Sequence, residues 1–241
     1  MTEPKATPEE APSNPAFAHV EAWIFDLDNT LYPASSRLFD QVDRRIGEFI
    51  AESFALNAAD ARALQKHYFR SYGTTLRGLM TEKGVDPHAF LAYVHSIDRS
   101  ALAPAPALEA ALARLAGRKL VFTNGSADHA EKVMERLGIA HHFEAVFDVV
   151  AAGFVPKPDP ASYRLLLERH GIRSSAAAMI DDIARNLEPA KALGMTTVWL
   201  MTESEFARAG GDGAHVDHRI ADLVGFLETV IAEREAAASA G

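Results

Sequence analysis

The sequence predicts an α/β protein: a doubly wound, Rossmann-like parallel sheet with an inserted α-helical cap domain. Three observations predict this fold. Beyond about residue 100, short apolar runs alternate with segments of helical periodicity, as they do where helices connect parallel strands. An earlier apolar run, Val20 to Phe25, predicts a buried strand. Between the two, residues 34–103 show helical spacing and few strand signals, so we expect a separate helical domain there.

The expected domain boundaries follow from this alternation. The α/β core should comprise residues 19–33 and 104–235, with the cap at residues 34–103. Two prolines, at positions 104 and 106, mark the return to the core because they interrupt regular structure. Residues 1–18 contain four prolines and almost no large apolar side chain, which predicts a disordered tail.

The individual elements are expected in the following order. Apolar residues at helical spacing predict a first cap helix with one buried face, formed by Leu38, Val42, Ile46 and Ile50. Three more helical patterns in the cap cover residues 58–69, 76–82 and 87–96. The later core strands are expected at residues 120–122, 145–150, 176–180, 196–200 and 216–220. Glycines end the helices between these strands, and two residues are suited to begin such helices as N-caps, Ser126 and Asp159.

The composition is that of a globular protein and restricts its partners. Hydrophobic residues make up 48% of the chain and charged residues 24%, which are ordinary values for a globular domain. The net charge of −9 argues against a nucleic-acid or anionic membrane surface, and no apolar run approaches the ~18 residues needed to cross a bilayer. The chain has no cysteine and its first residues lack the basic and apolar blocks of a signal peptide, so we expect a cytoplasmic protein.

Two carboxylates stand where the first strand should end. Asp26 and Asp28 are two residues apart, and residues at that spacing in a strand project to the same side. Like charges held together in a buried place are unfavourable unless a cation or a proton offsets them. Since ligands bind at the carboxyl ends of strands in open parallel sheets, this pair predicts a Mg²⁺ site that takes part in a reaction.

Three later motifs extend the pattern. Thr123-Asn124-Gly125 follows an apolar strand, Lys157 stands between two prolines, and the run Met179-Ile180 ends in Asp181 and Asp182. In this order and spacing, over roughly residues 20 to 200, the four motifs resemble those of the haloacid dehalogenase (HAD) superfamily of aspartyl-phosphate enzymes. The resemblance implies an α/β core carrying the chemistry and a helical cap inserted after the first strand.

The resemblance also implies roles for these residues. Asp26 would be the nucleophile that forms an aspartyl-phosphate. Asp28 would protonate the leaving oxygen and then activate water, and burial is expected to raise its pKa for the acid role. Thr123 would bind a phosphoryl oxygen through its hydroxyl, and Asn124 and Gly125 would do so through their backbone N–H groups. An aspartate equivalent to Asp28 is present in the phosphatases and phosphomutases of the superfamily and absent from its dehalogenases and phosphonatases.

The remaining charged groups complete the implied site. Lys157 would neutralise charge on the nucleophile and on the transferring phosphoryl group. The Asp26 side chain, the Asp28 backbone carbonyl and an acid of the fourth motif would hold Mg²⁺, a hard cation that takes few carboxylates and keeps several waters. Asp182 would be the direct ligand of that motif, and Asp181 would bind directly or through water. Asn186 would lie behind these ligands without touching the metal.

The cap is where substrate choice is expected. Residues 68–79 gather aromatic, basic and hydroxyl groups around a turn, and we take Tyr68, Tyr72, Thr74 and Arg77 as candidate specificity residues. Tyrosines can stack on a base or ribose, and arginine can bind phosphate or base carbonyls. The same residues could instead be cap core and a turn between two helices.

The substrate expected from the resemblance is a small phosphomonoester. The cap stretch and the motifs around Asp28 and Asp181 are similar to those of the pyrimidine 5′-nucleotidase branch, which removes phosphate from nucleoside monophosphates such as UMP and CMP. One alternative is a sugar-phosphate or phosphoglycolate phosphatase, or a phosphomutase, of the same fold; another is a non-catalytic binding protein. We expect no nucleic-acid or membrane partner, and a monomer or a homodimer.

Overall fold

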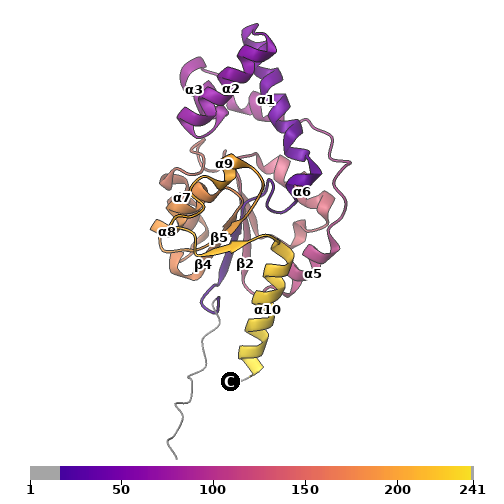
Figure 1. The fold of residues 1–241 in the computed structure, drawn as a ribbon, viewed down its shortest axis with the longest axis vertical. Coiled ribbons are helices and arrows are strands. Elements are labelled where there is room, and N and C mark those ends of the chain that lie inside the picture. Colours follow the sequence, from indigo (N-terminus) through magenta and orange to yellow (C-terminus); the bar gives the residue numbers. More distant parts are fainter. Residues whose placement is uncertain (1–16, 240–241) are drawn as a thin grey trace, which may run out of the picture.

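The computed structural model describes residues 17–239 and contains the predicted parallel sheet (Figure 1). Six strands, all parallel to their neighbours, lie in the order β3-β2-β1-β4-β5-β6. Their bounds are Ala22–Phe25 (β1), Arg118–Phe122 (β2), Ala145–Phe147 (β3), Ala177–Asp181 (β4), Thr196–Leu200 (β5) and His218–Ile220 (β6). The strand order reverses at β1, and ligands of open α/β sheets bind outside the carboxyl ends of the strands at such a switch point.

Helices cover both faces of the sheet, because alternate strand residues are apolar on both sides. Trp23 and Phe25 belong to one buried cluster, together with residues of α5 (Pro106–Arg114), α6 (Ala127–Leu137) and α10 (Leu223–Ser239). Ala22 and Ile24 belong to the other, together with residues of α7 (Pro160–His170) and α8 (Leu187–Ala192). Strands buried on both faces are typical of doubly wound sheets.

The cap follows β1 and forms a helical unit above the carboxyl ends of the strands (Figure 1). Its helices are α1 (Leu38–Phe54), α2 (Ala58–Tyr72), α3 (Thr75–Lys83) and α4 (Pro87–Val94). They share a buried core of their own, which includes Ile50, Tyr68, Leu79 and Phe90. Gly78 allows α2 and α3 to pack closely, since a Cβ there would lie 2.5 Å from carbon atoms of the Tyr68 side chain.

The structure differs from the sequence predictions at three places. The strand expected at residues 145–150 ends at Phe147, because the Asp148 carboxylate accepts hydrogen bonds from the backbone N–H groups of Ala127 (2.8 Å) and Ala151 (2.7 Å) and turns the chain. A short helix, α9 (Glu205–Arg208), was not expected. Phe17, inside the predicted tail, is only 3% exposed and packs near Trp23; residues 1–16 of that tail lie outside the described residues.

No helix within residues 17–239 combines the length and the apolar character needed to span a bilayer.

Candidate active site

The register of the sheet brings the first and fourth motifs together. Phe25 lies opposite Ile180 of β4, and the backbone N–H of Asp26 donates to the Ile180 carbonyl at 2.9 Å. Asp26 therefore leaves β1 at the level where Asp181 ends β4. Beyond Asp28, Asn29 adopts a left-handed conformation with φ of 61°, which asparagine tolerates better than most residues. The chain then turns back so that the Thr30 hydroxyl lies 3.4 Å from Asp26 Oδ2.

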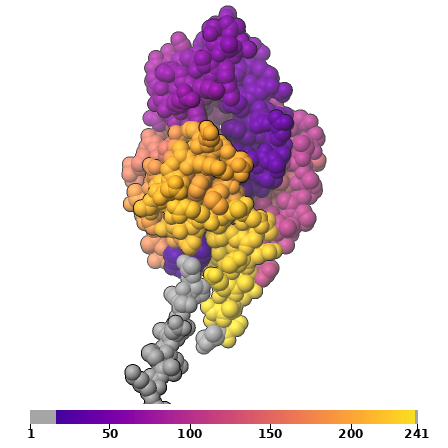
Figure 2. Space-filling model, in the orientation of Figure 1, coloured from indigo at the N-terminus to yellow at the C-terminus, as the bar shows by residue number. Residues whose placement is uncertain are grey.

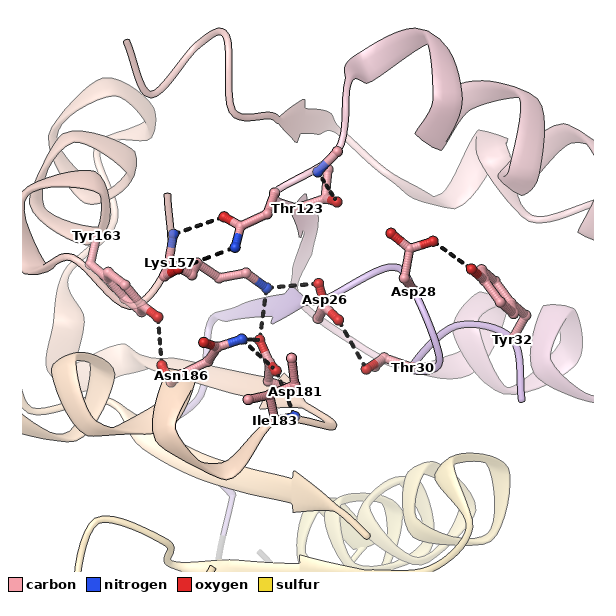
Figure 3. A network of polar contacts seen from close by, with 12 residues as sticks. Asp26, Asp28, Thr30, Tyr32, Thr123, Lys157, Tyr163, Asp181, Ile183 and Asn186 are labelled. Carbon is pink, nitrogen blue, oxygen red and sulfur yellow. Dashed lines mark hydrogen bonds and ion pairs between the residues drawn. The ribbon is translucent and has the colours of Figure 1, made fainter. Parts of the chain in front are cut away.

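Lys157 bridges two of the predicted carboxylates (Figure 3). Its Nζ lies 2.7 Å from Asp26 Oδ1 and 2.7 Å from Asp181 Oδ2, and all three side chains are buried. Burial alone would lower the pKa of Lys157, but the attraction of Asp181 and Asp26 outweighs it and raises the pKa above its ordinary value. The lysine is therefore a permanent cation of the site.

One lysine does not balance the acidic groups around it. Carboxylate oxygens of Asp26, Asp181 and Asp182 all lie within 4.8 Å of one another, and all three residues are buried. Burial and the neighbouring carboxylates raise the pKa of Asp26 to about 7, against the lowering effect of Lys157. The same causes raise the pKa of Asp182 to about 9. When ionised, three carboxylates and one ammonium leave two negative charges, which is the charge of a site for a divalent cation.

The two aspartates of the fourth motif differ in their partners. Asp181 is fully engaged: Lys157 binds one oxygen, the backbone N–H of Ile183 donates to the other at 2.9 Å, and the Asn186 amide donates to both at 3.0 and 3.2 Å. The Asp182 carboxylate makes no hydrogen bond within the described part of the chain, although the residue is only 3% exposed. A buried carboxylate without a donor is unfavourable alone, so Asp182 fits a cation better than Asp181 does.

Asp28 lies on the other side of Asp26 from Lys157 and has different neighbours (Figure 3). Its Oδ1 accepts a hydrogen bond from the Tyr32 hydroxyl, and His129 Nε2 lies 3.2 Å from the same oxygen. Burial raises the pKa of Asp28, but the electrostatic effect of the His129 N–H and the hydrogen bonds from His129 and Tyr32 outweigh it and hold the pKa below its ordinary value. The expectation of a raised pKa for Asp28 was therefore wrong, because the sequence did not reveal that His129 and Tyr32 contact this carboxylate.

The second motif holds the Lys157 loop in place. The Asn124 side chain accepts from the backbone N–H of Lys157 at 2.8 Å and donates to its carbonyl at 3.2 Å. The predicted contribution of Asn124 was its backbone N–H, so its side chain has a role that the sequence did not suggest. Thr123 Oγ1 accepts from the Gly125 N–H at 2.9 Å, which leaves the hydroxyl proton to be donated elsewhere (Figure 3).

The candidate cap residues divide into two groups. Tyr72 and Arg77 line a cavity of about 300 Å³ that also borders Lys157 and Asp159, and Arg77 Nη1 lies 3.6 Å from Asp159 Oδ2. Tyr68 is 4% exposed in the core of the cap and does not line this cavity, and Thr74 caps α3 by accepting from the Arg77 N–H at 3.2 Å. The structure therefore places two of the four beside Lys157 and gives the other two packing and capping contacts.

Several residues of the site had no role predicted from the sequence. Tyr32 contacts Asp28 from the loop after β1, and His129 contacts it from the first turn of α6. Trp199 donates its indole N–H to the Asp182 carbonyl at 2.8 Å, and the Tyr163 hydroxyl donates to the Asn186 carbonyl at 2.5 Å. Only the spatial proximity of separate elements brings these side chains to the motifs.

A second group of metal-ligating side chains lies apart from these motifs. Glu109, His141 and His142 have ligand atoms within 4.8 Å of one another, but none of the three is buried. Of the two groups found in residues 17–239, the buried one therefore coincides with the predicted motifs.

Comparison with known proteins assigns the family. The family model of haloacid dehalogenase-like hydrolases matches residues 20–194 of the sequence, and the chain belongs to this family of hydrolases. It is 29% identical over 211 residues to "Phosphate metabolism protein 8" of Saccharomyces cerevisiae, covering 80% of this chain but only 63% of that relative. It is 28% identical over 198 residues to the phosphoglycolate phosphatase of Rhodospirillum rubrum, covering 74% of this chain and 78% of the relative.

Solved structures support the fold. A HAD phosphatase from Thermococcus onnurineus superposes with a TM-score of 0.58 at 15% identity, covering 88% of this chain and 98% of that structure. Other similar proteins include haloacid dehalogenases as well as phosphatases. The fold therefore does not choose between these two reactions, and the choice depends on the residues of the site.

Proposed function

We propose that this protein is a Mg²⁺-dependent phosphomonoesterase that forms an aspartyl-phosphate on Asp26. The observation that carries the proposal is the buried cluster in which Lys157 bridges Asp26 and Asp181 while the Asp182 carboxylate stays unpaired. Phosphatases among the similar proteins support it. Asp28 favours phosphoryl transfer over dehalogenation, since a second carboxylate beside the nucleophile can exchange a proton with a leaving alkoxide.

The proposed reaction has two displacements. An oxygen of Asp26 attacks phosphorus, the bond from phosphorus to the ester oxygen breaks, and Asp28 gives its proton to the leaving oxygen. Asp28 gains that proton when the anionic substrate binds, because negative charge near a carboxylate raises its pKa. Asp28 then takes a proton from water, which attacks phosphorus and releases Asp26 and inorganic phosphate.

The charged residues stabilise both displacements. Lys157 keeps Asp26 oriented and offsets the charge on the phosphoryl oxygens, and the Thr123 hydroxyl can donate to one of them. Asp26, Asp182 and the Asp28 carbonyl would hold Mg²⁺, which supplies positive charge to the transferring phosphoryl group when it is bound. In this proposal Asp181 orients Lys157, and Asn186 orients Asp181.

The substrate we propose is a pyrimidine nucleoside monophosphate such as UMP or CMP. Supporting it are the position of Tyr72 and Arg77 beside the Lys157 loop and the resemblance of the motifs to that branch. The second candidate is a phosphoglycolate or sugar-phosphate phosphatase, favoured by the relative from R. rubrum. A phosphomutase would need to exclude water, and a non-catalytic role would not require the complete set of charged residues. Action in the cytoplasm as a monomer or homodimer remains part of the proposal.

The test is phosphate release from a panel of esters, each with Mg²⁺ and with EDTA. The panel holds UMP, CMP, dTMP, AMP, GMP, phosphoglycolate, glucose phosphates and p-nitrophenyl phosphate. Mg²⁺-dependent preference for UMP and CMP supports the full proposal. Preference for phosphoglycolate or a sugar phosphate keeps the mechanism and replaces the substrate, while activity unaffected by EDTA would contradict the metal site. Absence of phosphate release from every ester would overturn the proposed reaction.

A further inference from the structure

We propose that His129 is the positioning residue for Asp28: its Nε2–H holds Oδ1 of the carboxylate so that Oδ2 remains available for proton exchange. The inference rests on the proposed function, in which Asp28 exchanges protons with the leaving group and with water. His129 lies inside α6, a helix that the sequence predicted from its apolar face and its cap alone. Its side chain is fully buried, and its Nε2 lies 3.2 Å from Asp28 Oδ1.

The partner on the far side of the ring fixes which nitrogen carries the proton. Arg99 Nη2 lies 3.2 Å from His129 Nδ1. A guanidinium can only donate, so Nδ1 must accept, and a neutral imidazole then carries its proton on Nε2. The Nε2–H points at Asp28 and donates to it. Arg99 is itself held, since its Nη2 also donates to the His95 carbonyl at 2.8 Å and its Nη1 to the Ile97 carbonyl at 3.2 Å.

The plane of the ring is held by a second histidine. His95 stacks on His129 with ring centroids 4.4 Å apart and an interplanar angle of 14°. His95 follows α4 of the cap, and its Nδ1 lies 2.8 Å from the Ser126 hydroxyl at the start of α6. The His129 imidazole is therefore fixed by an ion at one edge and a ring on one face, which leaves it one orientation toward Asp28.

The arrangement leaves half of the carboxylate free. Tyr32 and His129 both bind Oδ1, and no donor within residues 17–239 binds Oδ2. Figure 3 shows the Tyr32 hydroxyl at one oxygen of Asp28 while the other oxygen is turned away from Tyr32. Two donors on a single oxygen orient a carboxylate more firmly than one, because they restrict rotation about its last bond.

This role makes a specific kinetic prediction. Protonation of the leaving oxygen matters for a basic alkoxide, such as the 5′ oxygen of a nucleoside, and hardly matters for p-nitrophenolate, which leaves without a proton. The parameter kcat/KM covers the steps up to aspartyl-phosphate formation. Loss of the Asp28 orientation should therefore lower kcat/KM for the preferred alkyl phosphate and leave kcat/KM for p-nitrophenyl phosphate nearly unchanged.

The experiment compares these two substrates in full-length His129→Phe, His129→Gln and Arg99→Met proteins. His129→Phe keeps a stacking ring without a donor, and His129→Gln can return an N–H near the position of Nε2. Arg99→Met keeps the imidazole but removes the group that assigns its proton. His142→Phe is the matched control, because His142 has a carboxylate partner at a similar distance, Glu109 Oε1 at 3.2 Å, and lies outside the site.

The expected results follow from the part of general acid catalysis that depends on orientation. We expect His129→Phe to lower the ratio of kcat/KM for the alkyl phosphate to that for p-nitrophenyl phosphate by about 10- to 100-fold, out of the roughly 10²- to 10⁴-fold that a positioned acid supplies. Arg99→Met should lower the ratio less, His129→Gln should recover part of it, and His142→Phe should leave it at the wild-type value.

The outcomes distinguish failure of the inference from failure of the function on which it rests. If the wild-type protein releases phosphate but neither His129→Phe nor Arg99→Met changes the ratio, the positioning role is refuted and the reaction stands. An equal loss on both substrates means a structural role and also refutes the inference. If His129→Phe does not fold, the ratio of the two kcat/KM values in Arg99→Met shows whether the positioning role holds, since an unchanged ratio refutes it. A wild-type protein without phosphatase activity removes the proposed function itself.

Discussion

Asp182→Asn should stabilise the metal-free protein while abolishing its activity. The carboxylate of Asp182 is buried, makes no hydrogen bond in the described part of the chain, and has its pKa raised to about 9 from an ordinary value of 3.8. At pH 8 the unfolded chain carries this group ionised, and the folded protein must either take up a proton or bury the charge. An amide of nearly the same shape removes that penalty and also removes the metal ligand.

The magnitude follows from the pKa difference. The interval between 3.8 and pH 8 is about four pH units, and each unit corresponds to about 1.4 kcal/mol, so the penalty has an upper limit of about 6 kcal/mol. Relaxation around the site reduces the gain to about 2–4 kcal/mol, which at roughly 2–4 °C per kcal/mol raises the melting temperature by about 4–16 °C. Because a raised pKa gives stability at low pH that is lost as pH rises, the gain should shrink as pH falls from 8 toward 5.

Thermal melts in EDTA and in Mg²⁺ measure both effects. Wild-type protein should be stabilised by Mg²⁺, since a ligand that binds only the folded state shifts the equilibrium toward it. Asp182→Asn should melt higher than wild type in EDTA at pH 8 and respond little to Mg²⁺. Asp212→Asn, which changes an exposed carboxylate, is the control and should match wild type in both buffers. A lower melting temperature for Asp182→Asn in EDTA, or an unchanged response to Mg²⁺, would refute the account of the site.

Three further predictions test separate parts of the proposal. Asp26→Asn should abolish phosphate release without loss of fold, measured by phosphate assay and circular dichroism; normal turnover would reject Asp26 as nucleophile. Arg77→Ala should raise KM for nucleotides more than KM for p-nitrophenyl phosphate. Asp159→Asn breaks the same ion pair but keeps an N-cap for α7, and it should not change the two KM values differently. Equal effects of both variants would mean that Arg77 serves to hold the cap. Tyr163→Phe leaves the buried Asn186 carbonyl without its donor and should lower the free energy of unfolding in urea by about 1–3 kcal/mol; no change would mean that water replaces the hydroxyl.

The sequence could predict the elements that obey local rules. Alternating apolar runs gave the order of strands and helices, and the register of β1 and β4 then brings Asp26 level with Asp181. The order of the elements was predicted correctly because each element depends on a few neighbouring residues. The family resemblance gave Lys157 a role beside Asp26, but its contact with Asp181 was not predicted. The place of the motifs follows from the general rule that ligands bind at the carboxyl edge of the sheet.

The remainder depends on contacts between distant parts of the chain. His129 shows only helical periodicity in the sequence, and its contact with Asp28 joins residues 101 positions apart. Tyr68 and Tyr72 are four residues apart on one helix, yet one is buried in the cap core and the other lines the cavity beside Lys157. No local pattern separates such pairs, because burial is decided by the helix that packs against them.

The cap and the core also meet outside the cavity beside Lys157. Phe69 of α2 lies with its ring centroid 4.6 Å from that of Phe206 in α9, and the Arg185 guanidinium lies over the Phe206 ring at 4.1 Å. Figure 2 shows the surfaces of the cap and of the core meeting on this face. Arg185 follows the fourth motif closely in the chain, so the cap contacts a segment that also carries Asp181 and Asp182.

Residues of both chain connections between cap and core support the Asp28 carboxylate, directly or through His129. The chain leaves Asp28 for the cap through Tyr32, whose hydroxyl returns to Asp28, and it comes back through His95 and Arg99, which hold His129 against Asp28. Within the proposed mechanism, a rotation of the cap about its two connections would move His95 and Arg99 relative to His129 and so change the support of Asp28. The proposed proton exchange would then depend on the position of the cap, since closure of a cap over a site excludes water.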